Sequence, residues 1–145
     1  MMSSESEIRT LLEIRAEACQ TKDVDRLMEL YAPDIVYYDV VPPMRFAGLD
    51  EIRRNFVRWF DEYDGPIELE TRELIVAAGA EVAFAHMLHM DSGKRKNGMQ
   101  TSIWVRSSLC FRRVGDEWLI THEHISVPIN PQNLRAWFPP DSEPI

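Results

Sequence analysis

The feature that most constrains the fold is the second half of the chain, which consists of long strand-like runs separated by short turns. Four runs rich in β-branched and aromatic residues follow one another, at residues 67–78, 81–91, 99–114 and 118–127. Gly115-Asp116, between the last two runs, is a signal for a two-residue hairpin loop. Strands joined by such short connections pair with their sequence neighbours, so the pattern predicts an antiparallel meander.

The first part of the chain is predicted to be mainly helical. Apolar residues recur at helical spacing between residues 7 and 20, and Asp23 is a suitable N-cap for a second, shorter helix that ends before Pro33. A short strand is expected at residues 35–41, and a third helix is expected from a cap at about Asp50 to Glu62. These elements predict an α+β fold, in which a cone-shaped curved antiparallel sheet wraps around three N-terminal helices and leaves a small-molecule pocket on its concave face.

Length and composition predict one domain and exclude several classes of protein. A chain of 145 residues with 45% apolar residues fits a single domain over 1–145, with an irregular, proline-rich tail from about residue 129. The formal charge is −8 and no stripe of Lys or Arg occurs, which argues against a nucleic-acid partner. No run approaches the roughly 20 apolar residues of a membrane span.

The N-terminus and the cysteines predict the compartment. The opening residues are acidic and lack the basic-then-apolar layout of a secretory signal, so we expect none. Cys19 and Cys110 lie far apart in the sequence and form no CxxC motif. We therefore predict two free thiols and a cytoplasmic protein.

Three segments carry a resemblance to a known family. They are Tyr31–Asp39 (YAPDIVYYD), Gly48–Arg53 (GLDEIR) and Trp118–Ser126 (WLITHEHIS). With the two preceding helices, they resemble the SnoaL-like, or ketosteroid-isomerase-like, superfamily, whose fold is also called the nuclear-transport-factor-2-like cone. The last segment is also similar to the last strand of the calcium/calmodulin-dependent kinase association domain. The resemblance covers roughly residues 5–130.

The resemblance implies the cone fold and a choice between several activities. The superfamily includes isomerases, polyketide cyclases, dehydratases, epoxide hydrolases and modules without activity, because one fold supports many functions. Asp39 matches the proton-shuttling aspartate of ketosteroid isomerase, an enzyme that pairs this base with Tyr and protonated Asp donors. The positions that match those donors hold Arg15 or its neighbour and a residue near Leu109, so the steroid-specific pattern is not reproduced.

Three histidines are candidates to act with Asp39. His122 and His124 are two residues apart in a predicted strand and therefore point to one face, whereas in the run 81–91 His86 and His89 point to opposite faces. We expect His86, His122 and His124 to share the concave face with Asp39, which would give a pocket capable of proton transfer. The alternative is that the histidines are hydrogen-bonded core residues and that Asp39 organises the turn before Pro42.

Tyr37, Trp104 and Arg106 are candidate ligand-binding residues. Tyr37 shares a face with Asp39 and offers a hydroxyl donor, although aromatic packing is an equally good explanation. An arginine in the pocket would favour an anionic ligand, and on the convex face Arg106 would pair with Glu123 or with a second subunit.

The orientation of Arg106 depends on the register of the last hairpin. A two-residue loop at Gly115-Asp116 sets Leu109 opposite His122 and turns Arg106 away from the pocket. A three-residue loop sets Arg106 against His124, because a slip of one residue inverts the faces of a strand. The sequence leaves both registers open.

The predicted partners are a small, mostly apolar metabolite and a second copy of the chain. We expect a homodimer because the convex face would otherwise expose a large apolar surface, made of Met87, Leu119, Ile125, Val127 and Trp104. We expect no cofactor, and no metal although the HxH pattern suits one, because pockets of the family that the chain resembles typically work without one. The leading hypothesis is acid–base chemistry of the isomerase, cyclase or dehydratase kind on a carbonyl compound. The alternative is a non-catalytic ligand-binding or association module.

Overall fold

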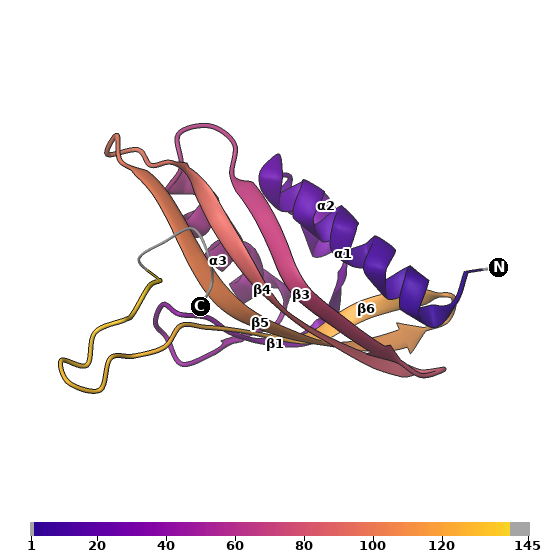
Figure 1. The fold of residues 1–145 in the computed structure, drawn as a ribbon. Coiled ribbons are helices and arrows are strands. Elements are labelled where there is room, and N and C mark those ends of the chain that lie inside the picture. Colours follow the sequence, from indigo (N-terminus) through magenta and orange to yellow (C-terminus); the bar gives the residue numbers. More distant parts are fainter. Residues whose placement is uncertain (1, 140–145) are drawn as a thin grey trace.

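Three helices and a six-stranded sheet make up the computed structural model, which describes residues 2–139 (Figure 1). The helices are α1 (Ser4–Gln20), α2 (Val24–Met28) and α3 (Leu49–Asp61). The strands are β1 (Tyr31–Tyr38), β2 (Phe46–Ala47), β3 (Glu68–Ala78), β4 (Val82–Lys94), β5 (Gln100–Val114) and β6 (Glu117–Ser126). Residues 127–139 form neither helix nor strand, and the rest of the tail expected from the sequence, 140–145, lies outside the described residues.

The predicted α+β cone is confirmed. The strands are ordered β2-β1-β6-β5-β4-β3, and every neighbouring pair is antiparallel except β1 and β6, which run parallel. Figure 1 shows α1 lying along the strongly curved sheet, with β4 and β5 forming a long arched hairpin. Within residues 2–139, no helix combines the length and the apolar character that a membrane span requires.

The starts of the helices follow from local capping. The Ser3 hydroxyl accepts a hydrogen bond from the Ser6 amide at the start of α1, and the predicted Asp23 cap accepts one from the Arg26 amide at the start of α2. The predicted cap of α3 is wrong, because the helix already begins at Leu49. Gly48 precedes it with φ 86°, a conformation that glycine adopts without steric cost.

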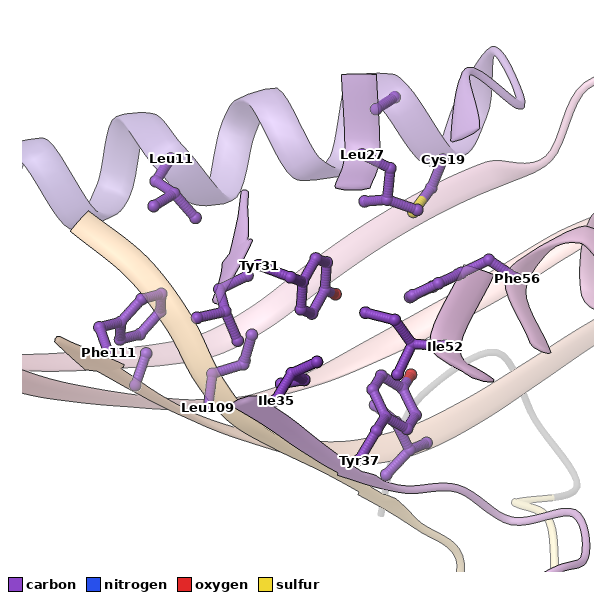
Figure 2. Close-up of a cluster of buried hydrophobic side chains, with 14 of the residues drawn as sticks. Leu11, Cys19, Leu27, Tyr31, Ile35, Tyr37, Ile52, Phe56, Leu109 and Phe111 are labelled. Atoms are coloured by element: carbon purple, nitrogen blue, oxygen red, sulfur yellow. The ribbon is translucent and has the colours of Figure 1, made fainter. Parts of the chain in front are cut away.

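The hydrophobic core lies between the helices and the concave face of the sheet (Figure 2). Side chains from α1, β1, α3 and β5 point toward one another there, including Leu11, Ile35, Ile52, Phe56, Leu109 and Phe111. Their burial removes apolar surface from water, at about 25 cal/mol for each Å², and this term holds the helices on the sheet.

One extra residue in β6 interrupts the last hairpin. Val114 pairs with Glu117 across a two-residue loop, as the tight-loop alternative requires. Farther along, the register shifts by one residue between the pairs Phe111–Ile120 and Cys110–His122. Thr121 therefore has no partner in β5, and its backbone forms a β-bulge.

The bulge reverses the alternation of side chains along β6. Ile120 before it and Glu123 after it both face the interior and are fully buried. His122 and His124 consequently face outward, although simple alternation puts them on the same side as Ile120.

Glu123 is the charged residue at the centre of the interior. Its carboxylate accepts hydrogen bonds from Arg15 Nη2 at 2.6 Å and from the Tyr31 hydroxyl at 2.6 Å, and Arg15 Nε also donates to that hydroxyl at 3.1 Å. Burial lowers the pKa of Arg15 and the Glu123 charge raises it, with a net result above its usual value, so the guanidinium stays charged. Burial is the main cause that raises the pKa of Tyr31. This closed triad attaches α1 to β1 and β6.

We expect Glu123→Gln to lower the free energy of unfolding by about 3–5 kcal/mol, because it leaves the Arg15 charge in the interior without its counterion. Urea unfolding followed by circular dichroism measures this change. Asp34→Asn is the matched control: it breaks the exposed Arg112–Asp34 pair, where the Asp34 side chain is 65% exposed, and we expect a loss below about 1 kcal/mol. Equal losses in the two variants would contradict a structural role for the triad.

Deletion of Thr121 tests the bulge. Without Thr121, the pairs Phe111–Ile120 and Cys110–His122 become consecutive, and all remaining side chains of β6 keep their faces. We therefore expect the variant still to unfold cooperatively. Deletion of Leu119 is the control, since it turns Ile120 outward and Thr121 inward. We expect that deletion to lower the free energy of unfolding by at least about 2 kcal/mol, the value of one buried Ile side chain. Thermal denaturation of both deletions measures the difference, and equal tolerance would exclude the proposed register.

Candidate functional site

A cavity of about 230 Å³ lies inside the cone, between α3 and the concave face of the sheet. Its apolar walls come from α3, β3, β5 and β6, with Phe56, Trp59, Leu69, Ile103, Val105 and Ile125. Its polar walls include Arg15, Tyr37, Asp39, His89 and Asp91. A mostly apolar hollow with a few polar groups is the usual form of a small-molecule site.

Asp39 lines this cavity directly after the end of β1. Its carboxylate accepts hydrogen bonds from the Val40 amide at 2.7 Å and from Asn55 Nδ2 at 2.8 Å. Arg58 donates to Asn55 Oδ1 from Nη2 at 3.0 Å and from Nε at 3.2 Å, which fixes the orientation of the amide. Asp39 thus faces the cavity and also organises its own loop, so both sequence interpretations apply to its geometry.

Tyr37 also lines the cavity, on the same face of β1 as expected. Its ring packs edge-on against Phe56, with ring centroids 5.6 Å apart, and Figure 2 shows the side chain among the core residues. Burial is the main cause that raises the pKa of Tyr37 well above its usual value, and the charges of Glu123 and Asp39 add to it. The hydroxyl therefore stays protonated and can donate a hydrogen bond to a ligand in the cavity.

His89 and Asp91 form a second polar pair on the cavity wall, which the sequence interpretation missed. His89 Nδ1 lies 3.2 Å from Asp91 Oδ1, and both side chains are largely buried. Because a carboxylate can only accept, Nδ1 carries a proton in this pair, and Nε2 is an acceptor in the neutral imidazole and a donor in the imidazolium. This Nε2 is buried and has no partner among the described residues. The pair has the arrangement of a general base oriented by a carboxylate.

The prediction that His86, His122 and His124 share the concave face with Asp39 is wrong. His86 is exposed on the outer face of β4, because it is three residues from His89 and strand faces alternate. The bulge at Thr121 turns the other two outward, where their rings contact Tyr38. The three histidines therefore gather on the outer face of the sheet.

Trp104 and Arg106 also lie on the outer face. Trp104 alternates with Ile103 and Val105, which line the cavity, and its ring lies beneath the Arg72 guanidinium at 5.5 Å. Arg106 is exposed and donates to the Ser126 hydroxyl at 3.1 Å. Arg106 thus faces away from the pocket, the orientation expected for the two-residue loop, although the bulge in β6 pairs it with Ser126.

The predicted pairing of Leu109 with His122 is wrong, because the bulge shifts the strands by one residue. Leu109 pairs with Glu123, and both face the interior. A bulge of this kind leaves no clear signal in the sequence.

Leu119, which alternates with the buried Trp118 and Ile120, and Trp104 lie on the convex face as expected, but other residues expected there do not. Ile125 and Met87 face inward, since Ile125 lines the cavity and Met87 packs against the core. The outer face presents Ile75, Val82 and Phe84, whose side chains are 51%, 66% and 50% exposed. We call these three residues the outer apolar patch.

The described residues contain no metal site and two free thiols. In the range 2–139, no group of three or more His, Cys, Asp or Glu side chains is arranged to hold a metal ion. Cys19 is buried and Cys110 is exposed, and burial raises the pKa of Cys19 to about 12.

Solved structures with this architecture are numerous. An NTF2-like protein of unknown function from Pseudomonas putida KT2440 is 29% identical, with a TM-score of 0.85 over 95% of this chain and 97% of that chain. A ketosteroid isomerase-like protein from Erwinia carotovora atroseptica SCRI1043 is 17% identical, with a TM-score of 0.74 over 87% and 97%. A proposed dehydratase of the NTF2-like family from Streptomyces avermitilis is 15% identical, with a TM-score of 0.72 over 83% and 93%.

Sequence comparisons identify the family to which this chain belongs. A search of curated proteins found no match. The family model for the SnoaL-like domain matches residues 8–130, which is most of the chain and contains the cavity residues described above. This chain therefore belongs to the SnoaL-like domain family.

Proposed function

We propose that the protein binds a small, mostly apolar carbonyl compound in the cavity and moves a proton on it. The observation that carries the proposal is a buried imidazole nitrogen, His89 Nε2, that has no partner among residues 2–139 and belongs to a residue on the wall of an apolar cavity. An unpaired polar group in the interior costs free energy, and a ligand that pairs with it recovers that cost.

The roles of the polar side chains follow from their chemistry. Asp39 is the proposed base: its carboxylate, held by Asn55 and Val40, takes a proton from the carbon next to the carbonyl. The Tyr37 hydroxyl donates a hydrogen bond to the carbonyl oxygen, where negative charge then develops. The protonated Asp39 then returns the proton to the same carbon or to another carbon of the enolate. His89 Nε2 is a second group on the wall that accepts a proton when the imidazole is neutral and donates one when it is protonated.

The charge of the cavity favours a neutral ligand. Arg15 is paired with Glu123, and Glu62 accepts from both Arg58 and Arg95. No cation of the wall is left to bind a carboxylate among the described residues. Carbonyl chemistry also fits the fold-level likeness to a ketosteroid isomerase-like protein and to a proposed dehydratase, although those similarities extend only to the fold.

A non-catalytic binding protein is the second candidate. The observation that favours it is that both carboxylate oxygens of Asp39 already accept hydrogen bonds from the protein. In that case the cavity binds the same class of ligand without catalysis, and the only role of Asp39 is to stabilise its own loop.

Proton exchange at carbon separates the two candidates. We expect the protein to accelerate α-hydrogen exchange of a cyclic ketone such as 2-tetralone in D₂O, measured by ¹H NMR. Asp39→Asn and His89→Gln should each lower this rate at least about 100-fold, the usual contribution of a general base. His86→Gln, on the outer face of the same strand, is the matched control and should leave the rate unchanged.

Two results would contradict the catalytic proposal. If His86→Gln lowers the exchange rate as much as His89→Gln does, the chemistry takes place outside the cavity. Saturable binding of the ketone without any exchange favours the binding protein.

We also propose a homodimer formed through the outer face of the sheet. The outer apolar patch lies there, and exposed apolar groups gathered on one face commonly mark a protein interface. His86 stacks on Phe84 with ring centroids 6.3 Å apart, so this outward histidine borders the patch. This gives His86 a place in an interface rather than in catalysis.

Phe84→Glu should convert the dimer to a monomer, because it places a charge within the patch. Analytical ultracentrifugation at micromolar concentration measures the change. Met99→Glu is the control, since Met99 is 60% exposed but lies in the β4–β5 turn, away from the patch. A wild-type protein that sediments only as a monomer would refute the dimer.

A further inference from the structure

A second cavity, of about 200 Å³, lies beneath α1. Its apolar walls come from α1, β3, β4 and β5, with Leu12, Ala16, Leu74, Met87 and Leu109. Three residues, Arg15, Leu69 and His89, line both this cavity and the first one. The two hollows therefore adjoin at these three side chains.

The three shared side chains differ in how firmly they are held. Arg15 is bound to Glu123 and Tyr31, and His89 is bound to Asp91. Leu69 is only partly buried, packs against the core and has no polar group to fix its rotamer. Rotation of this one aliphatic side chain breaks no hydrogen bond and no ion pair.

The volumes indicate that the hollows work together. Ligand sites usually have about 300–1,000 Å³. The first cavity, at about 230 Å³, and the second, at about 200 Å³, each fall below this range, but their combined volume lies within it. The partner-free His89 Nε2 belongs to a residue that lines both hollows, so a ligand that occupies both passes a buried polar atom that needs a partner.

We propose that the two cavities form one bipartite site for an elongated, neutral carbonyl compound. Its ring and its carbonyl group occupy the first cavity, which Tyr37, Asp39 and His89 line, and its unbranched apolar tail passes Leu69 and lies beneath α1. This inference rests on the proposed function, because it assumes that the first cavity binds the ring of a carbonyl compound.

Alkyl phenyl ketones of increasing chain length, from acetophenone to octanophenone, test the proposal by isothermal titration calorimetry. Acetophenone fits the first cavity alone. Beyond the length that passes Leu69, each added methylene should tighten binding by about 3- to 4-fold, the value expected for burying one CH₂ group.

Filling the second cavity should abolish this gain. In Ala16→Phe, acetophenone should bind as it does to the wild type, whereas the longer ketones should bind no more tightly than acetophenone. Leu74→Trp fills the same cavity from β3 and serves if Ala16→Phe does not unfold cooperatively. Ala77→Phe is the matched control, since it adds a ring to the outer face of β3 and should keep the full gain.

The outcomes separate this inference from the proposed function. A wild-type protein that binds acetophenone without a gain from chain length, or a gain that survives in both filled variants, overturns the bipartite site and leaves the first cavity intact. Failure of acetophenone and all longer ketones to bind overturns the ligand site itself, and the bipartite arrangement with it.

Discussion

The β-bulge at Thr121 is the constraint on which the interior of this protein depends. Without it, β6 would keep one alternation over its whole length, with His122 inside and Glu123 outside. The extra residue instead points Glu123 toward Arg15 and puts Ile125 on the wall of the cavity. One unpaired backbone position thus decides the chemistry of the concave face and of the convex face together.

The buried charge of Glu123, which the bulge turns inward, helps to fix the position of α1. Arg15 bridges Glu123 and Tyr31, so α1 is attached to the sheet by directional contacts as well as by apolar packing. The same Arg15 side chain lines both cavities. The polar residues of the walls are likewise held in place, Asp39 by Asn55 and His89 by Asp91, which is the preorganisation that a binding or proton-transfer site requires.

The part of the site that could be predicted came from β1. Tyr37 and Asp39 alternate on one face of a short strand, and the family resemblance marked Asp39, so both were expected in the cavity, where the structure has them. His89 was missed for a physical reason: β4 is apolar on both of its faces, so its alternation does not distinguish His86 from His89. The spacing His89-x-Asp91, which puts an imidazole and a carboxylate on one face, was the signal available.

Apart from the two-residue strand β2, the sequence by itself determined the elements, their order and the fold class, because these depend on local periodicity, turn chemistry and caps such as Asp23. Only the tertiary structure decided which face of each long strand turns inward. That choice depends on a single-residue bulge and on contacts such as Arg15 with Glu123, which join residues 108 positions apart. Local sequence patterns do not reveal such contacts. A shift of one residue in register reverses which side chains of a strand face the interior and which face outward.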